Sequence, residues 1–66
     1  MKKHMIKATN KEGQTLYFQI MAGTKYLLTS IEYFAFTTFN RQMLEGRIDE
    51  MKAQYPDHNF ELCTEI

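Results

Sequence analysis

The alternation of apolar and polar side chains predicts a β-hairpin at the start of the chain. Within residues 14–21, the apolar Leu16, Phe18 and Ile20 occupy every second position, which is the period of a strand with one face toward a core. Residues 4–9, which precede them, are predicted to form the shorter first arm of this hairpin. The connection, residues 10–13, begins with a turn-forming Asn and ends with Gly, which is typical of a hairpin loop whose glycine is left-handed.

Two more strands are predicted further along the chain. Residues 22–24 (Ala-Gly-Thr) form a break, and residues 25–29 then have the composition of a short strand. At the other end, apolar or β-branched positions 60, 62, 64 and 66 alternate with Glu61, Cys63 and Glu65. This alternation predicts a final strand.

A helix is predicted from about Asn40 to Tyr55. Its apolar positions recur at intervals of four, three and four residues: Leu44, Ile48, Met51 and Tyr55. Either Asn40 or Thr38 caps its start, and Pro56 disfavours helical geometry at the residue before it.

Residues 30–39 are ambiguous between two structures. Ser30 followed by an acidic residue favours a short helix, which we take as the prediction. The aromatic and β-branched residues that follow favour an extended strand.

Together these elements predict a single small α+β domain over residues 1–66. Its mainly antiparallel sheet consists of the β-hairpin, the third strand and the C-terminal strand, and one main helix packs on one face. The sheet residues expected to face this helix are Ile6, Ala8, Leu16, Phe18, Ile20, Phe60, Leu62 and Ile66.

Composition limits how such a domain is stabilised. The chain has 66 residues, and its 44% of hydrophobic residues is too high for a disordered segment. A domain of this size buries only about 60% of its unfolded surface, so a disulfide, a metal or a partner is usually needed. The lone Cys63 cannot form an internal disulfide. With no signal peptide or membrane-spanning run in the sequence, we expect a cytoplasmic protein.

The charges are unevenly distributed although the net charge is zero. Residues 1–30 carry a net charge of +4 and residues 31–66 a net charge of −4. If the first and last strands are neighbours, Lys3 or Lys7 should lie across from Glu61 or Glu65. The zero total argues against a protein built to grip phosphate backbones.

The sequence contains few groups for catalysis or metal binding. The candidate metal ligands are His4, Asp57, His58 and Cys63, and their spacing matches no structural zinc pattern. Cys63 and His58 do not form a recognisable catalytic pair, and no phosphate-binding glycine loop is present. We therefore expect no metal, no cofactor and no enzymatic activity.

The sheet face away from the helix is the predicted functional surface. Because one helix covers only one side of the sheet, the other side should display a protein-binding surface formed by Met5, Tyr17, Gln19, Met21 and Tyr26, with Cys63 nearby. This composition indicates a protein-binding module, a small regulator or inhibitor that docks on a larger protein or forms a homodimer. Chains of this kind are common among accessory proteins of bacteria and phages.

The alternative function is binding of single-stranded nucleic acid, with no membrane involved. Tyr17 on the sheet would stack on unpaired bases, and Lys7 and Lys25 would contact phosphates. The negative charge introduced by Tyr17→Glu should abolish protein association under the first hypothesis.

Overall fold

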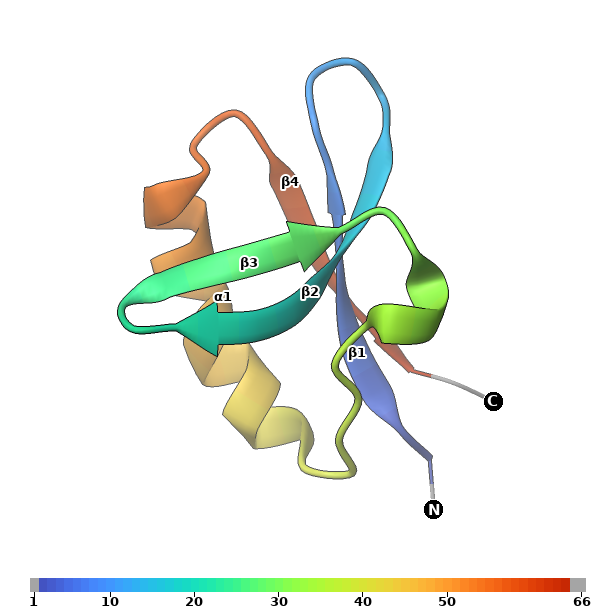
Figure 1. The fold of residues 1–66 in the computed structure, drawn as a ribbon. Coiled ribbons are helices and arrows are strands. Elements are labelled where there is room, and N and C mark those ends of the chain that lie inside the picture. The colour runs from blue at the N-terminus through green and yellow to red at the C-terminus, as the bar shows by residue number, and fades with distance from the viewer. Residues whose placement is uncertain (1, 65–66) are drawn as a thin grey trace.

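A four-stranded antiparallel sheet and one α-helix make up this domain, which confirms the predicted α+β class (Figure 1). The computed structural model describes residues 2–64. The strands are β1 (His4–Thr9), β2 (Thr15–Ala22), β3 (Lys25–Thr29) and β4 (Asn59–Thr64), in the order β3-β2-β1-β4. A 3₁₀ turn, η1 (Glu32–Phe34), and the helix α1 (Arg41–Gln54) lie between β3 and β4 in the chain.

The first hairpin forms as its loop residues predict. The Asn10 side-chain oxygen accepts hydrogen bonds from the backbone N–H groups of Glu12 (3.1 Å) and Gln14 (2.9 Å). Gly13 has a φ of +82°, a left-handed conformation that glycine adopts without steric cost. These local interactions set the register in which Lys7 lies opposite Tyr17.

Helix α1 begins and ends close to the predicted positions. Asn40 is its N-cap and accepts a hydrogen bond from the Met43 backbone N–H at 3.3 Å. The helix ends just before Tyr55 and Pro56. Leu44 and Met51 are fully buried, so the predicted apolar stripe is the face that packs on the sheet.

Strand β2 contains a β-bulge that changes which side chains face the helix. Phe18 pairs with Leu28, but Ile20 pairs with Leu27, so the register shifts between Phe18 and Ile20. An extra residue in one strand breaks the strict alternation of faces. Ile20 is therefore 54% exposed rather than in the core, and its predicted core position was wrong.

Two residues that were predicted to lie on the open face lie on the side of α1 instead. The shift in β2 turns Met21 to that side, whereas Tyr26 lies there with Leu28 by the ordinary alternation of β3. Beyond the bulge, Met21 pairs with Tyr26, and Tyr26 is only 1% exposed in the core cluster. Both residues lie on the side of α1, where they line a cavity beside Leu44. Their predicted placement on the open face with Tyr17 was wrong.

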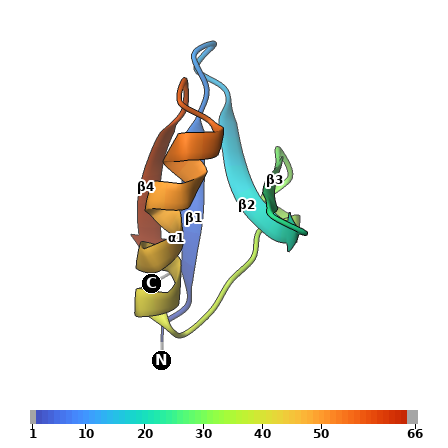
Figure 2. The same cartoon turned by 90° about the vertical axis from the view of Figure 1, so that its left-hand side faces the viewer.

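The bulge also bends β2 away from β1. Figure 2 shows β2 lying beside β1 at one end and diverging at the other, where it carries β3 with it. The structure pairs β1 with β2 only at Lys7, Ala8 and Thr9.

Residues 36–38 occupy the place beside β1 that β2 leaves. The Phe36 N–H donates to the Phe18 carbonyl at 2.8 Å, and Thr38 exchanges two backbone hydrogen bonds with His4 (2.7 and 3.1 Å). The helix predicted for residues 30–39 is thus limited to the three residues of η1. The segment that follows is extended, which is what its β-branched and aromatic residues favoured.

Side chains from the end of α1 hold strand β3. The Tyr26 backbone N–H donates to the Gln54 side-chain oxygen at 2.9 Å, and the Tyr55 hydroxyl donates to the Tyr26 carbonyl at 2.6 Å. The Gln54 amide also donates to the Thr24 carbonyl. These contacts satisfy backbone groups that an edge strand otherwise leaves open.

Strands β1 and β4 are neighbours, and the pairing predicted for that case is confirmed. Lys7 lies directly opposite Glu61 and Met5 opposite Cys63. The predicted roles of Glu65 and Ile66 lie outside the described residues. Of the other residues expected to face the helix, Phe60 and Leu62 pack against the core, and Leu16 is half-buried.

Candidate binding surfaces

The five residues predicted to form one protein-binding surface do not lie together. Met5 and Tyr17 are half-buried on the sheet face away from α1, and Gln19 is exposed at the bulge. Met21 is 41% exposed on the helix side, and Tyr26 is buried. Tyr26 in particular has no surface to offer a partner, because its ring fills the core.

The sheet face away from α1 is partly covered by its own chain. A hollow of about 720 Å³ lies there, and residues from the segment 32–37 form one of its walls. The sequence predicted that this face is left open, which was wrong because the connection to α1 crosses it. The hollow is lined by Lys3, Met5, Lys7, Tyr17, Glu32, Tyr33, Ala35, Thr37, Cys63 and Thr64.

Cys63 in this hollow is not activated as a nucleophile. Burial raises the pKa of the Cys63 thiol, and the negative charge of Glu61 raises it further, while Lys7 lowers it to a smaller extent. His58 packs instead against the rings of Tyr55 (5.1 Å) and Phe60 (6.1 Å). In residues 2–64, no group of three or more His, Cys, Asp or Glu side chains is placed to hold a metal ion.

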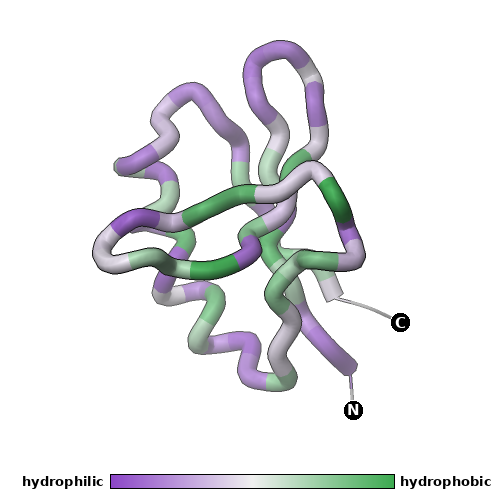
Figure 3. Tube along the Cα trace, viewed as in Figure 1, coloured by the Kyte–Doolittle hydropathy of each residue, from purple (hydrophilic) through white to green (hydrophobic). Residues whose placement is uncertain are grey.

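A second surface is formed by exposed apolar side chains at β2, β3 and η1. We call it the hairpin surface and define it as Ile20, Leu27, Ile31 and Phe34, which are 54%, 37%, 52% and 51% exposed. Ile20 and Leu27 are directly paired, and η1 packs against β2. Figure 3 shows hydrophobic stretches at the end of β2, along β3 and again in the segment after β3.

Sequence reasoning missed this surface for two reasons. Strand alternation assigned Ile20 to the core, because the bulge is not visible in the pattern. Ile31 and Phe34 lie in the segment whose structure was ambiguous. The useful signal was the density of large apolar residues in the segment 31–36, which exceeds what a short connection needs for its own packing.

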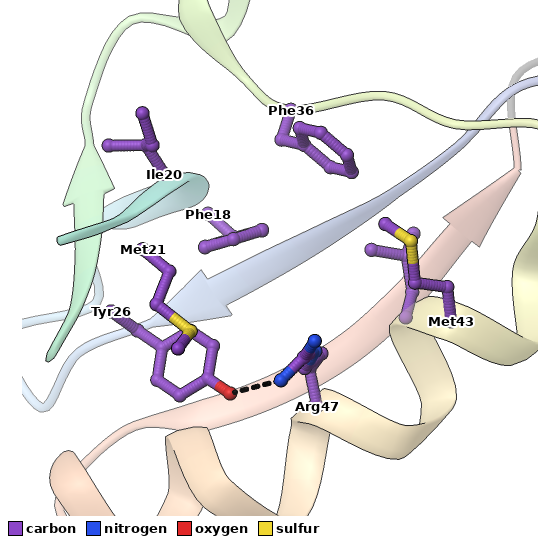
Figure 4. Close-up of a pocket in the computed structure, with 8 residues that line it drawn as sticks. Phe18, Ile20, Met21, Tyr26, Phe36, Met43 and Arg47 are labelled. Carbon is purple, nitrogen blue, oxygen red and sulfur yellow. Dashed lines mark hydrogen bonds between the residues drawn. The ribbon is translucent and has the colours of Figure 1, made fainter. Parts of the chain in front are cut away.

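The third feature is a cavity between the hairpin formed by β2 and β3 and the helix α1 (Figure 4). Its volume is about 280 Å³, and it is lined by Phe18, Ile20, Met21, Tyr26, Phe36, Met43, Leu44 and Arg47. Three of these residues, Phe18, Tyr26 and Leu44, belong to the buried core. The cavity is therefore a place where the core reaches the surface.

Arg47 is the only charged residue that lines this cavity. Its guanidinium donates a hydrogen bond of 3.4 Å to the Tyr26 hydroxyl, which itself donates to the Glu50 carboxylate. Burial, together with the hydrogen bond to Glu50, raises the pKa of Tyr26, so its hydroxyl stays protonated. Glu50 lies 3.8 Å from Arg47 and lines a neighbouring groove rather than the cavity.

Comparison with known proteins adds no relative to this picture. No protein family model, no curated protein and no solved structure matches the chain. In the part of the chain that the structure describes, no helix is long and apolar enough to cross a membrane.

Proposed function

We propose that this chain is a non-enzymatic protein-binding module that docks through the hairpin surface. The observation that supports the proposal is the clustering of exposed apolar side chains. Within residues 2–64, eight large apolar or aromatic side chains are more than a third exposed, and four of these eight form the hairpin surface. Exposed apolar side chains on neighbouring elements are typical of interaction sites.

The strength of such an interaction follows from the area available. Covering the exposed half of each of the four side chains contributes about 1 kcal/mol per side chain, or about 4 kcal/mol in total. Association costs at least about that much in lost rotational and translational freedom. Burial of these four side chains therefore only offsets the smallest cost of association, so a measurable affinity requires further contacts from the polar neighbours of the hairpin surface.

We propose two partners for the hairpin surface: a second copy of the chain and a larger protein. A two-fold dimer would place the same surface of each copy against the other. Its formation would supply the additional burial that a 66-residue domain needs.

Light scattering over a wide concentration range tests the self-association. We expect a concentration-dependent dimer that Leu27→Asp dissociates, because the substitution places a charge in the apolar surface. Thr15→Asp is the matched control, since Thr15 is an exposed position on β2 outside the hairpin surface. A chain that stays monomeric at the highest concentration contradicts the dimer.

A photo-reactive amino acid tests docking on a larger protein. Placed at position 27, it should crosslink one reproducible protein in the cells that make the chain, and Ile20→Asp should abolish the product. Placed at position 15, it should not crosslink that protein. The same crosslinks from both positions, or none from position 27, would contradict docking through this surface.

A second candidate function, binding of single-stranded nucleic acid, is favoured by the hollow on the sheet face away from α1. That hollow brings together two cations, Lys3 and Lys7, and two aromatic rings, Tyr17 and Tyr33. Tyr33 is 89% exposed and is thus accessible for stacking on a base.

Fluorescence anisotropy with labelled oligonucleotides distinguishes the two functions. Nucleic-acid binding requires an affinity that falls steeply with salt and drops several-fold in Tyr33→Ala, because stacking is worth about 1 to 3 kcal/mol per base. Leu27→Ala is the matched control, because Leu27 belongs to the hairpin surface and does not line the hollow. The absence of binding at low salt excludes this function.

A further inference from the structure

The cavity between the β2–β3 hairpin and α1 is an unfilled part of the core. Phe18, Tyr26 and Leu44 are nearly or fully buried, yet each contributes to its wall. Phe36 closes another side and packs against Phe18 at 5.6 Å between ring centroids. An apolar group placed there would contact core side chains on several sides, as a core residue does.

The size of the cavity limits what it can hold. A cavity of about 150 Å³ lined by apolar side chains accommodates benzene. At about 280 Å³, this one has room for an aromatic ring with a short aliphatic chain. Its volume lies just below the usual range for drug-sized ligands, which favours a small ligand.

The chemistry of the lining selects the polar end of the ligand. Apart from the Tyr26 hydroxyl and the Arg47 guanidinium, the lining side chains are hydrocarbon or thioether. The Tyr26 hydroxyl is already engaged with Glu50 and Arg47. Arg47 is partly exposed, and its Nη1 both donates to the Tyr26 hydroxyl and lies 3.8 Å from the Glu50 carboxylate. Because a guanidinium has five N–H donors, the donors on its other nitrogens remain for a ligand.

We propose that this cavity binds a small carboxylic acid with an aromatic tail, the tail against Phe18, Phe36 and Leu44 and the carboxylate on Arg47. The planar guanidinium matches a carboxylate with paired N–H donors. Met21 and Met43 stand on opposite walls, one from β2 and one from α1, and their flexible side chains adapt to the shape of the tail (Figure 4). This site is separate from the hairpin surface, although Ile20 borders both.

Three matched probes test the proposal on the full chain: phenylbutyrate, phenylbutanol and phenylbutylamine. They share one tail and differ only in the head group. We expect the acid to bind about tenfold more tightly than the alcohol, because a charge-assisted hydrogen bond replaces a neutral one. The amine should bind most weakly, because its charge repels that of Arg47.

Methionine methyl groups labelled with carbon-13 report where each probe binds. The signals of Met21 and Met43 should shift on titration with phenylbutyrate, since both side chains line the cavity. Met5 lines the hollow on the other sheet face, and its signal should remain unchanged. A shift of Met5 alone would place the ligand elsewhere and overturn the proposal.

Arginine variants test the head-group selection. Arg47→Gln should remove the roughly tenfold preference for the acid over the alcohol, while the tail still shifts Met21 and Met43. Arg41→Gln, on the same helix, is the matched control, because Arg41 pairs with Glu45 and does not line the cavity. Equal binding of the acid and the alcohol by the unmodified chain, or no shift of Met21 and Met43 with any probe, overturns the proposal.

Discussion

Replacement of Tyr26 by alanine is expected to unfold the chain. Tyr26 is 1% exposed and is the largest fully buried side chain, with its ring against Phe18 at 5.7 Å. Truncation of a buried aromatic residue to alanine costs about 3 to 5 kcal/mol. A core in a domain of this size rarely supplies more than about 3 to 5 kcal/mol of net stability. Far-ultraviolet circular dichroism should therefore show loss of the folded spectrum without denaturant.

Two other tyrosine variants show whether burial of the ring causes this loss. Tyr33→Ala removes the same ring from a position that is 89% exposed, and its urea midpoint should match that of the unmodified chain. Tyr26→Phe keeps the buried ring and removes only the hydroxyl contacts with Glu50 and Arg47. It should remain folded and lose about 1 kcal/mol. A folded Tyr26→Ala variant with an unchanged midpoint would contradict the assignment of Tyr26 to the core.

The elements that the sequence predicts correctly are those with local causes. Asn10 and Gly13 determine the first hairpin within a few residues of themselves. Asn40 and Pro56 bound α1, and the spacing of Leu44 and Met51 defines its buried face. The sequence left the strand order open, but the pairing of Lys7 with Glu61 that it predicted for neighbouring first and last strands is confirmed. Each of these signals is readable in a short stretch of sequence.

The β-bulge in β2 could not be predicted, because its causes are distant in the sequence. The run Leu16, Phe18, Ile20 alternates without interruption, so nothing in it marks an extra residue. The contacts that accompany the bulge come from distant parts of the sequence. The Phe36 backbone N–H donates a hydrogen bond to the Phe18 carbonyl, and the Gln54 side chain accepts one from the Tyr26 backbone N–H. Such contacts exist only after α1 and its connection have packed.

The error in the candidate site has the same origin. The sequence predicted that exposed apolar groups would form a surface, but the bulge changed which groups those are. It turns Ile20 outward to join Leu27 and turns Met21 toward α1, where Tyr26 lies with Leu28. The bend that accompanies it separates β2 from β1 and leaves the cavity that Phe36 and Met43 only partly fill. One irregularity thus accounts for both the hairpin surface and the cavity.

A negative charge at Met51 or at Ile20 should have opposite consequences for folding. Met51 on α1 is 0% exposed in the core cluster, whereas Ile20 is 54% exposed. Burial of an unpaired carboxylate costs several kcal/mol, which exceeds the stability that a domain of this size has available. Met51→Asp is therefore expected to be unfolded at neutral pH by circular dichroism. Ile20→Asp should keep the folded spectrum, with a stability change within about 0.5 kcal/mol.

This pair of variants tests whether β2 contains the bulge or alternates without interruption. If β2 had no bulge and Ile20 faced α1 with Phe18, Ile20→Asp would unfold the chain as Met51→Asp does. A folded Ile20→Asp variant shows that Ile20 is a surface residue, and it then permits the docking experiments, which require a charged hairpin surface on an intact fold. Unfolding of Ile20→Asp would contradict the bulge and, with it, the hairpin surface on which the proposed function rests.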